Sequence, residues 1–141
     1  MGSASRRPRV AGYLDSLGSM PIVTVELVAE SDHGSDRNLA QALADAVGHA
    51  LASPPGQTWV RLRWLASHEY AENESPVSTD QLPVLVSVVK RQLPPASELQ
   101  AEVSALTEAV AKTVGRPAAC VHVAYEPAAA GRLSFGGKLV Q

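Results

Sequence analysis

The sequence predicts an α+β fold in which two β-α-β units form a four-stranded sheet with two helices on one face. Three observations predict it. A proline followed by β-branched residues opens a strand pattern twice, at 21–28 and 83–90. Each strand pattern is followed by a helical pattern and then by a second alternating strand, so the chain contains a repeat. Each unit is long enough for a right-handed crossover between two parallel strands.

The first helix is predicted over residues 36–53, where leucine, valine and alanine recur at helical spacing. Ser35 is its expected N-cap, and the prolines that follow, Pro54 and Pro55, are expected to end it. This gives the first unit one amphipathic helix to cover its strands.

The second helix is predicted over residues 97–115, where apolar residues again share one face. Ser97 and Gln100 are expected to form a capping box at its start. Gly115, followed by Pro117, is expected to stop it.

The remaining strands are predicted at 58–65 and 119–126, and Arg61 and His122 occupy the same place in the two copies. Alternation turns every second residue of each strand, including Trp64, toward the helices. The opposite face has no helix to cover it and carries too many apolar residues to meet water. We therefore expect that face to be buried by oligomerisation.

The chain length of 141 residues favours one folded domain, preceded by a flexible extension. A Gly-Gly turn between short apolar pieces near the end predicts a hairpin. The expected divisions are an extension at 1–19 and a domain at 20–141, the latter made of a first unit at 21–65, a linker at 66–81, a second unit at 82–127 and a hairpin at 128–141.

Composition excludes several classes of function. The net charge of −2 gives no basic field for nucleic acid, and no apolar run approaches the ~18 residues of a membrane span. The single cysteine, Cys120, is expected to be a buried thiol and excludes an internal disulfide. The four histidines share no metal-ligand spacing, so no metal is expected. Residues 1–19 contain arginines but no apolar core of a signal peptide, so a cytoplasmic location is expected.

The dipeptide Met20-Pro21 has two interpretations. Proline at the first position of a strand is structurally ordinary, because its missing N–H costs no ladder hydrogen bond there. Met-Pro is also what a chain start looks like when the initiator methionine is removed, and Pro21 would then carry a secondary amine.

The segment MPIVTVELV at 20–28, the duplicated units, the strand VRLRW and the terminal FGGKLV resemble the tautomerase superfamily. This family includes 4-oxalocrotonate tautomerase, malonate semialdehyde decarboxylase, the 3-chloroacrylic acid dehalogenases and macrophage migration inhibitory factor. The resemblance spans roughly residues 20 to 140. It implies a homotrimer whose sheets surround a central barrel, a small carboxylate-bearing substrate and no cofactor.

The resemblance also implies site residues. Pro21 matches the family's catalytic N-terminal proline, a general base and acid. Arg61 matches an arginine of the second strand in the 4-oxalocrotonate group, and Arg91 matches one after the third strand in decarboxylase and dehalogenase members. Leu133 and Phe135 fall where the family places residues of the pocket wall. Arg63, His122, Tyr70 and Tyr125 are further pocket candidates.

The sequence also departs from the family. No arginine follows the first strand, where the sequence reads AESDHGS at 29–35, and no residue matches the acid or the water-activating residues of the dehalogenases. Two classes of function therefore stay open. One is a cofactor-independent tautomerase, or a related dehalogenase or decarboxylase. The other is a catalytically silent trimeric binding protein whose proline is blocked by residues 1–19.

Overall fold

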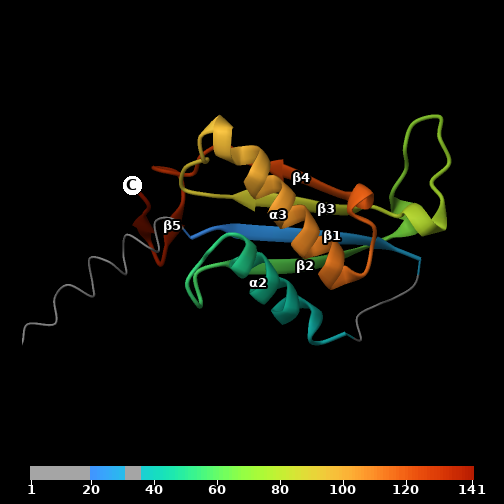
Figure 1. Ribbon diagram of the computed structural model, residues 1–141, viewed down its shortest axis with the longest axis horizontal. Coiled ribbons are helices and arrows are strands. Elements are labelled where there is room, and N and C mark those ends of the chain that lie inside the picture. The colour runs from blue at the N-terminus through green and yellow to red at the C-terminus, as the bar shows by residue number, and fades with distance from the viewer. Residues whose placement is uncertain (1–19, 31–35) are drawn as a thin grey trace, which may run out of the picture.

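Two β-α-β units and a small hairpin make up the fold of the computed structural model, which describes residues 20–30 and 36–141 (Figure 1). The flexible extension predicted at 1–19 lies outside these residues, as does Ser35, the predicted N-cap of the first helix. The elements are β1 (Ile22–Ala29), α2 (Leu39–Ala50), β2 (Trp59–Ala66), β3 (Val84–Val89), α3 (Ala96–Val114), β4 (Val121–Tyr125), β5 (Ser134–Phe135) and β6 (Lys138–Leu139).

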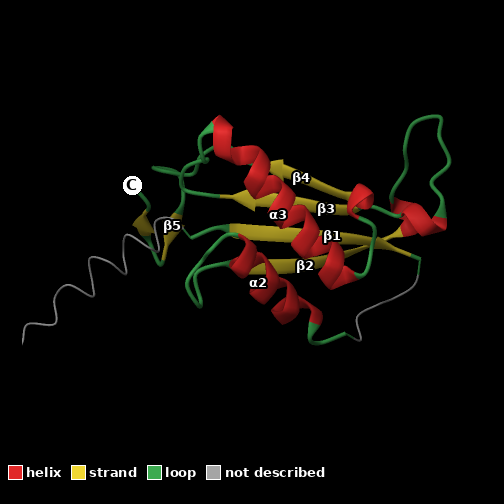
Figure 2. Cartoon of the chain, in the orientation of Figure 1, coloured by secondary structure: helices red, strands yellow, loops and turns green. Residues whose placement is uncertain are grey.

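The four long strands form one sheet in the order β2-β1-β3-β4. Strands β1 and β2 are parallel, β3 and β4 are parallel, and the two units meet where β1 runs antiparallel to β3. Figure 2 shows both long helices on the same face of the sheet. The predicted fold class is therefore confirmed. The antiparallel centre also places the start of β1 beside the end of β3, with Ile22 opposite Val89.

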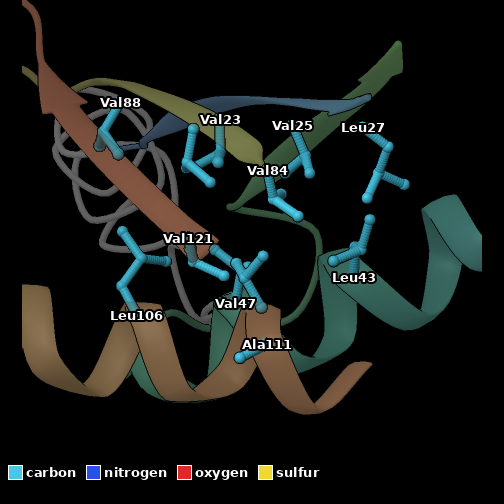
Figure 3. Close-up of a cluster of buried hydrophobic side chains, with 12 residues drawn as sticks. Val23, Val25, Leu27, Leu43, Val47, Val84, Val88, Leu106, Ala111 and Val121 are labelled. Atoms are coloured by element: carbon cyan, nitrogen blue, oxygen red, sulfur yellow. The ribbon is translucent and has the colours of Figure 1, made fainter. Parts of the chain in front are cut away.

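The core lies between the sheet and the two helices. Alternate residues of β1 and β3 point toward the helices and meet Leu43 and Val47 of α2 and Leu106 and Ala111 of α3 (Figure 3). The strand residues of this cluster are Val23, Val25, Leu27, Val84, Val86, Val88 and Val121. The whole cluster falls after Pro21, so a chain beginning at Pro21 retains this cluster and loses Met20 from the described buried apolar residues.

The helix ends agree only in part with the sequence prediction. Gly115 ends α3 as expected, in the left-handed conformation (φ 72°), and its N–H bonds the Ala111 carbonyl oxygen at 2.9 Å. The predicted capping box is wrong, because α3 begins at Ala96 and Ser97 already lies inside its first turn. Gln100 Nε2 instead donates to Ser104 Oγ at 3.1 Å.

The start of α2 was also predicted too early. Asn38 holds the N-cap position, without a side-chain capping bond, and the helix begins at Leu39. The Asn38 N–H bonds Asp36 Oδ1 at 3.1 Å, so the residues just before the helix form an Asx turn rather than helix.

The uncovered face of the sheet carries polar pairs at β1 and β2. Arg61 lies opposite Thr24 and Arg63 opposite Glu26 in the β1–β2 register. Apolar exposure is concentrated at β2, where Trp59 is 46% exposed and Trp64, on the helix side, is 37% exposed rather than buried. Because β2 is an edge strand, it pairs with β1 on one side and has no neighbouring strand of this sheet on the other.

The C-terminal hairpin is present as predicted. Strands β5 and β6 pair antiparallel, and both turn glycines, Gly136 and Gly137, have positive φ (57° and 87°). Two successive residues at positive φ are typical of the tight turn that suits a two-residue hairpin. The buried state expected for Cys120 is confirmed. Within the described parts of the chain, no helix is both long and apolar enough to cross a membrane.

Candidate functional site

A cavity of about 360 Å³ lies at the end of the sheet where β1 begins. Three segments form it: the residues that enter β1, the α2–β2 connection and the β3–α3 connection. The antiparallel pairing of β1 with β3 brings the first and third of these together. The lining residues are Met20, Pro21, Leu51, Ala52, Ser53, Pro54, Gln57, Lys90, Arg91, Gln92, Leu93 and Pro94.

Pro21 is buried in the wall of this cavity. Its carbonyl oxygen accepts a hydrogen bond from the Trp59 N–H at 3.1 Å, which fixes the entry of β1 against β2. In the full chain the Pro21 nitrogen is part of the amide bond to Met20, so its lone pair is delocalised and it has no basicity. Met20 is 2% exposed and lines the same cavity.

Lys90 reaches the cavity from the end of β3 and is held by α3. Its Nζ lies 2.7 Å from Glu102 Oε1. The hydroxyl of Tyr125, at the end of β4, donates to Glu102 Oε2 at 2.6 Å. Burial raises the pKa of Tyr125, and the hydrogen bond to Glu102 raises that pKa further. The phenol therefore remains a protonated donor well above neutral pH.

Arg91 is half-buried in the cavity wall and is held by the C-terminal segment. Its Nε donates to the backbone carbonyl oxygen of Gln141. Its own carbonyl oxygen accepts the Ala130 N–H at 3.1 Å. These two contacts fix the residue at the cavity. Among the described residues, the charged groups lining the cavity are Lys90 and Arg91, and no acidic side chain lines it.

The other predicted arginines lie elsewhere. Arg61 is exposed on the uncovered face, where its Nη2 donates to Thr24 Oγ1 at 3.2 Å. Arg63 and His122 line a second cavity, of about 310 Å³, on that same face. Within one chain, the structure thus brings Pro21 and Arg91 together and separates both from Arg61, Arg63 and His122.

The predicted wall residues of the hairpin lie near the Pro21 cavity but do not line it. Phe135 packs edge-on against Trp59, with ring centroids 5.1 Å apart. The carbonyl oxygen of Leu133 accepts the N–H of Val140, the residue after β6, at 2.7 Å. The hairpin therefore supports the residue that hydrogen bonds to Pro21. Tyr70, in the linker, donates to Glu72 at 2.8 Å and also lies outside the cavity lining.

Sequence reasoning did not identify Lys90, in the cavity wall, or Glu102, which pairs with Lys90. The sequence pattern indicates that Lys90 is a solvated charge at the end of a strand. It indicates that Glu102 is one of several acidic residues on a helix. A signal for Glu102 was present, because it precedes the buried Leu106 by one helical turn and so shares its face. An acid on the buried face of an amphipathic helix calls for a cationic partner.

Sequence comparison finds neither a matching family model nor a matching curated protein. Solved structures do share the fold. A fused 4-OT wild-type symmetric trimer matches with a TM-score of 0.63 and 20% identity, over 84% of this chain and 94% of that chain. Pt0534 inactivated by 2-oxo-3-pentynoate matches with a TM-score of 0.63 and 18% identity, over 84% of this chain and 94% of that one.

A third match is FG41 malonate semialdehyde decarboxylase inhibited by 3-bromopropiolate. It has a TM-score of 0.59 and 22% identity, over 82% of this chain and 88% of that one. These structures are matched over most of their own length, so the likeness extends through both β-α-β units and not to a single motif. The chain has the fold of the tautomerase superfamily, in the form in which one chain carries two β-α-β units.

Proposed function

We propose that the chain, once Pro21 is its N-terminal residue, is a cofactor-independent tautomerase-type isomerase of small keto or enol carboxylic acids. One observation carries the proposal: Pro21 and Arg91 line the same cavity. A secondary amine at Pro21 would be the general base and acid, and Arg91 would bind the carboxylate of the substrate.

The chemistry follows from the surroundings of Pro21. The neutral amine removes a proton from the enol oxygen or from the carbon beside the carbonyl, and the resulting ammonium returns a proton to the other atom. Burial beside the Arg91 guanidinium disfavours the ammonium, so the pKa of the amine falls below the value of about 8 of an ordinary α-amine. Because the base must be neutral, kcat/KM rises with pH through that pKa.

Arg91 suits carboxylate binding. Its contact with Gln141 engages Nε and leaves the two terminal nitrogens to pair with a carboxylate. The same guanidinium stabilises the negative charge that develops on the oxygen of the enolate. Structure neighbours support a small acid as substrate, since Pt0534 is inactivated by 2-oxo-3-pentynoate and the malonate semialdehyde decarboxylase is inhibited by 3-bromopropiolate. The latter keeps decarboxylation or dehalogenation in the same cavity as an alternative.

A second candidate function rests on Met20. As long as Met20 is attached, the proline nitrogen is an amide and the Met20 side chain stays in the cavity wall. In that form the protein would be a catalytically silent binding protein.

We further propose that the protein is a cytoplasmic homotrimer. The uncovered sheet face and the exposed Trp59 would pack against other copies. Two structure neighbours are fused 4-OT trimers. Since Arg61, Arg63 and His122 lie on the uncovered face, they would contribute to a Pro21 site only from another copy of the chain.

Arg91→Ala tests the proposal. In a chain beginning at Pro21, we expect this change to lower kcat/KM for the enol of phenylpyruvate by about 100-fold, because a charged clamp in a partly dry site supplies a few kcal/mol. The measurement is the loss of enol absorbance with time. Arg61→Ala in the same assay tests whether another copy supplies a second arginine.

Arg37→Ala is the matched control, because it removes the same charge from the chain. Arg37 lies just before the N-terminus of helix α2. The C-terminus of this 12-residue helix reaches the cavity, so the length of the helix, about 18 Å, separates Arg37 from the cavity. We expect activity within twofold of the parent. If the Arg91→Ala variant is as active as the parent, Arg91 does not bind the substrate carboxylate.

A further inference from the structure

The hydrogen-bonded network of Lys90, Glu102 and Tyr125 lies directly behind the Pro21 cavity. Three elements supply it: the end of β3, helix α3 and the end of β4. Glu102 accepts from Lys90 at 2.7 Å and from Tyr125 at 2.6 Å, one bond to each carboxylate oxygen. The side chains of Lys90 and Glu102 are only 18% and 17% exposed, so solvent screens this ion pair less than a surface pair.

The ion pair changes the charge that a ligand meets in the cavity. The lining alone presents two cations, Lys90 and Arg91. Glu102 does not line the cavity but compensates the Lys90 ammonium from behind. Among the side chains, an incoming anion therefore meets roughly one uncompensated positive charge, that of Arg91, whose Nε also bonds the main-chain oxygen of Gln141.

Tyr125 fixes the carboxylate in this arrangement. It is a neutral donor whose pKa is raised by burial and by its bond to Glu102, so it keeps its proton through the neutral range. With one oxygen held by the phenol, the other oxygen stays directed at Lys90. Because Tyr125 carries no charge of its own, it orients the pair without changing the net charge.

We propose that Glu102, held by Tyr125, is a positioning residue that sets the net positive charge of the Pro21 cavity, so that Arg91 and not Lys90 binds the anionic group of a ligand. The inference rests on the proposed function only in assigning a carboxylate to the cavity. It predicts that removing the charge of Glu102 tightens anion binding and that removing the charge of Lys90 weakens it. Removing both charges should leave the affinity near that of the parent.

The test is propionate binding to the full chain, followed by NMR titration at pH 7 and low ionic strength. Propionate has a carboxylate but cannot tautomerise, so the readout is independent of catalysis. Glu102→Gln leaves two uncompensated cations and should tighten binding about threefold. Lys90→Met leaves an uncompensated carboxylate and should weaken binding about threefold. The double variant should bind within a factor of about 1.5 of the parent.

Two further variants complete the comparison. Arg91→Met should weaken propionate binding at least about tenfold. Tyr125→Phe keeps every charge and the aromatic ring but releases one oxygen of Glu102, so it should tighten binding in the direction of Glu102→Gln and by less than that variant does. If Glu102→Gln does not fold, Glu102→Asp replaces it. The shorter carboxylate retains the charge, so binding should stay near the parent level while Lys90→Met still weakens it.

The inference is overturned if Lys90→Met abolishes binding and the double variant does not restore it, since Lys90 would then be a direct ligand. Failure of the parent chain to bind propionate also overturns it. Neither result depends on isomerase activity. Conversely, an inactive chain beginning at Pro21 that shows the expected binding pattern contradicts the proposed function alone.

Discussion

A chain that begins at Pro21 is expected to be at least about 1,000-fold more active as a tautomerase than the full 141-residue chain. Acylation of the Pro21 nitrogen removes its lone pair into amide resonance, so the full chain lacks the base altogether. Met20, which is 2% exposed beside Pro21, is also removed from the cavity wall. The measurement compares both chains on the enol of phenylpyruvate.

A chain that begins at Met20 is the matched control. It differs from the active form by a single residue, retains the described core and still carries Pro21 as an amide. We expect it to be as inactive as the full chain. Intact mass must verify each N-terminus after the assay. A full chain that is as active as the shorter one, with its mass unchanged, would exclude Pro21 as the base.

Leu106→Ala is expected to destabilise the protein by about 2–5 kcal/mol. Leu106 is fully buried between α3 and the sheet, and its truncation leaves a cavity at the centre of the core. Because Glu102 lies one turn earlier on the same helix, loosening of α3 should also disturb the Lys90 ion pair. Urea unfolding of the full chain measures the loss of stability.

Leu139→Ala removes the same atoms from an exposed site and is the control. Leu139 is 57% exposed on β6, so the expected loss is below about 0.5 kcal/mol. If the two variants unfold at the same urea concentration, the packing of α3 against the sheet is not as described.

The elements of the fold could be predicted because their signals are local. Alternation in β1 and β3 and helical spacing in α2 and α3 each lie within a short window, and Gly115 marks a helix end by its own conformation. The positions at which the helices begin were harder to predict. Ser97 is a good capping residue, but Pro95 precedes it at the N-cap and the chain becomes helical from Ala96, so the serine never occupies that position.

The site was predictable only where sequence position fixes spatial position. Pro21 and Arg91 meet because the start of β1 lies beside the end of β3, which follows from the pairing of the two units. The contact of Glu102 with Lys90 and Tyr125 depends on how α3 sits over the strands, and sequence periodicity does not give that placement. For Arg61, alternation gives the face of the strand but not its distance from Pro21.

In the proposed function the nitrogen of Pro21 is the reactive base of this cavity. The most direct measurement is peptide mass spectrometry after treatment with 2-oxo-3-pentynoate, the compound that inactivates the structure neighbour Pt0534. The chain beginning at Pro21 should lose activity and carry one adduct, on its N-terminal peptide at Pro21, while the full chain stays unmodified there. If an active chain beginning at Pro21 is inactivated without an adduct on Pro21, or carries only the adduct that the full chain also carries, Pro21 is not the reactive base.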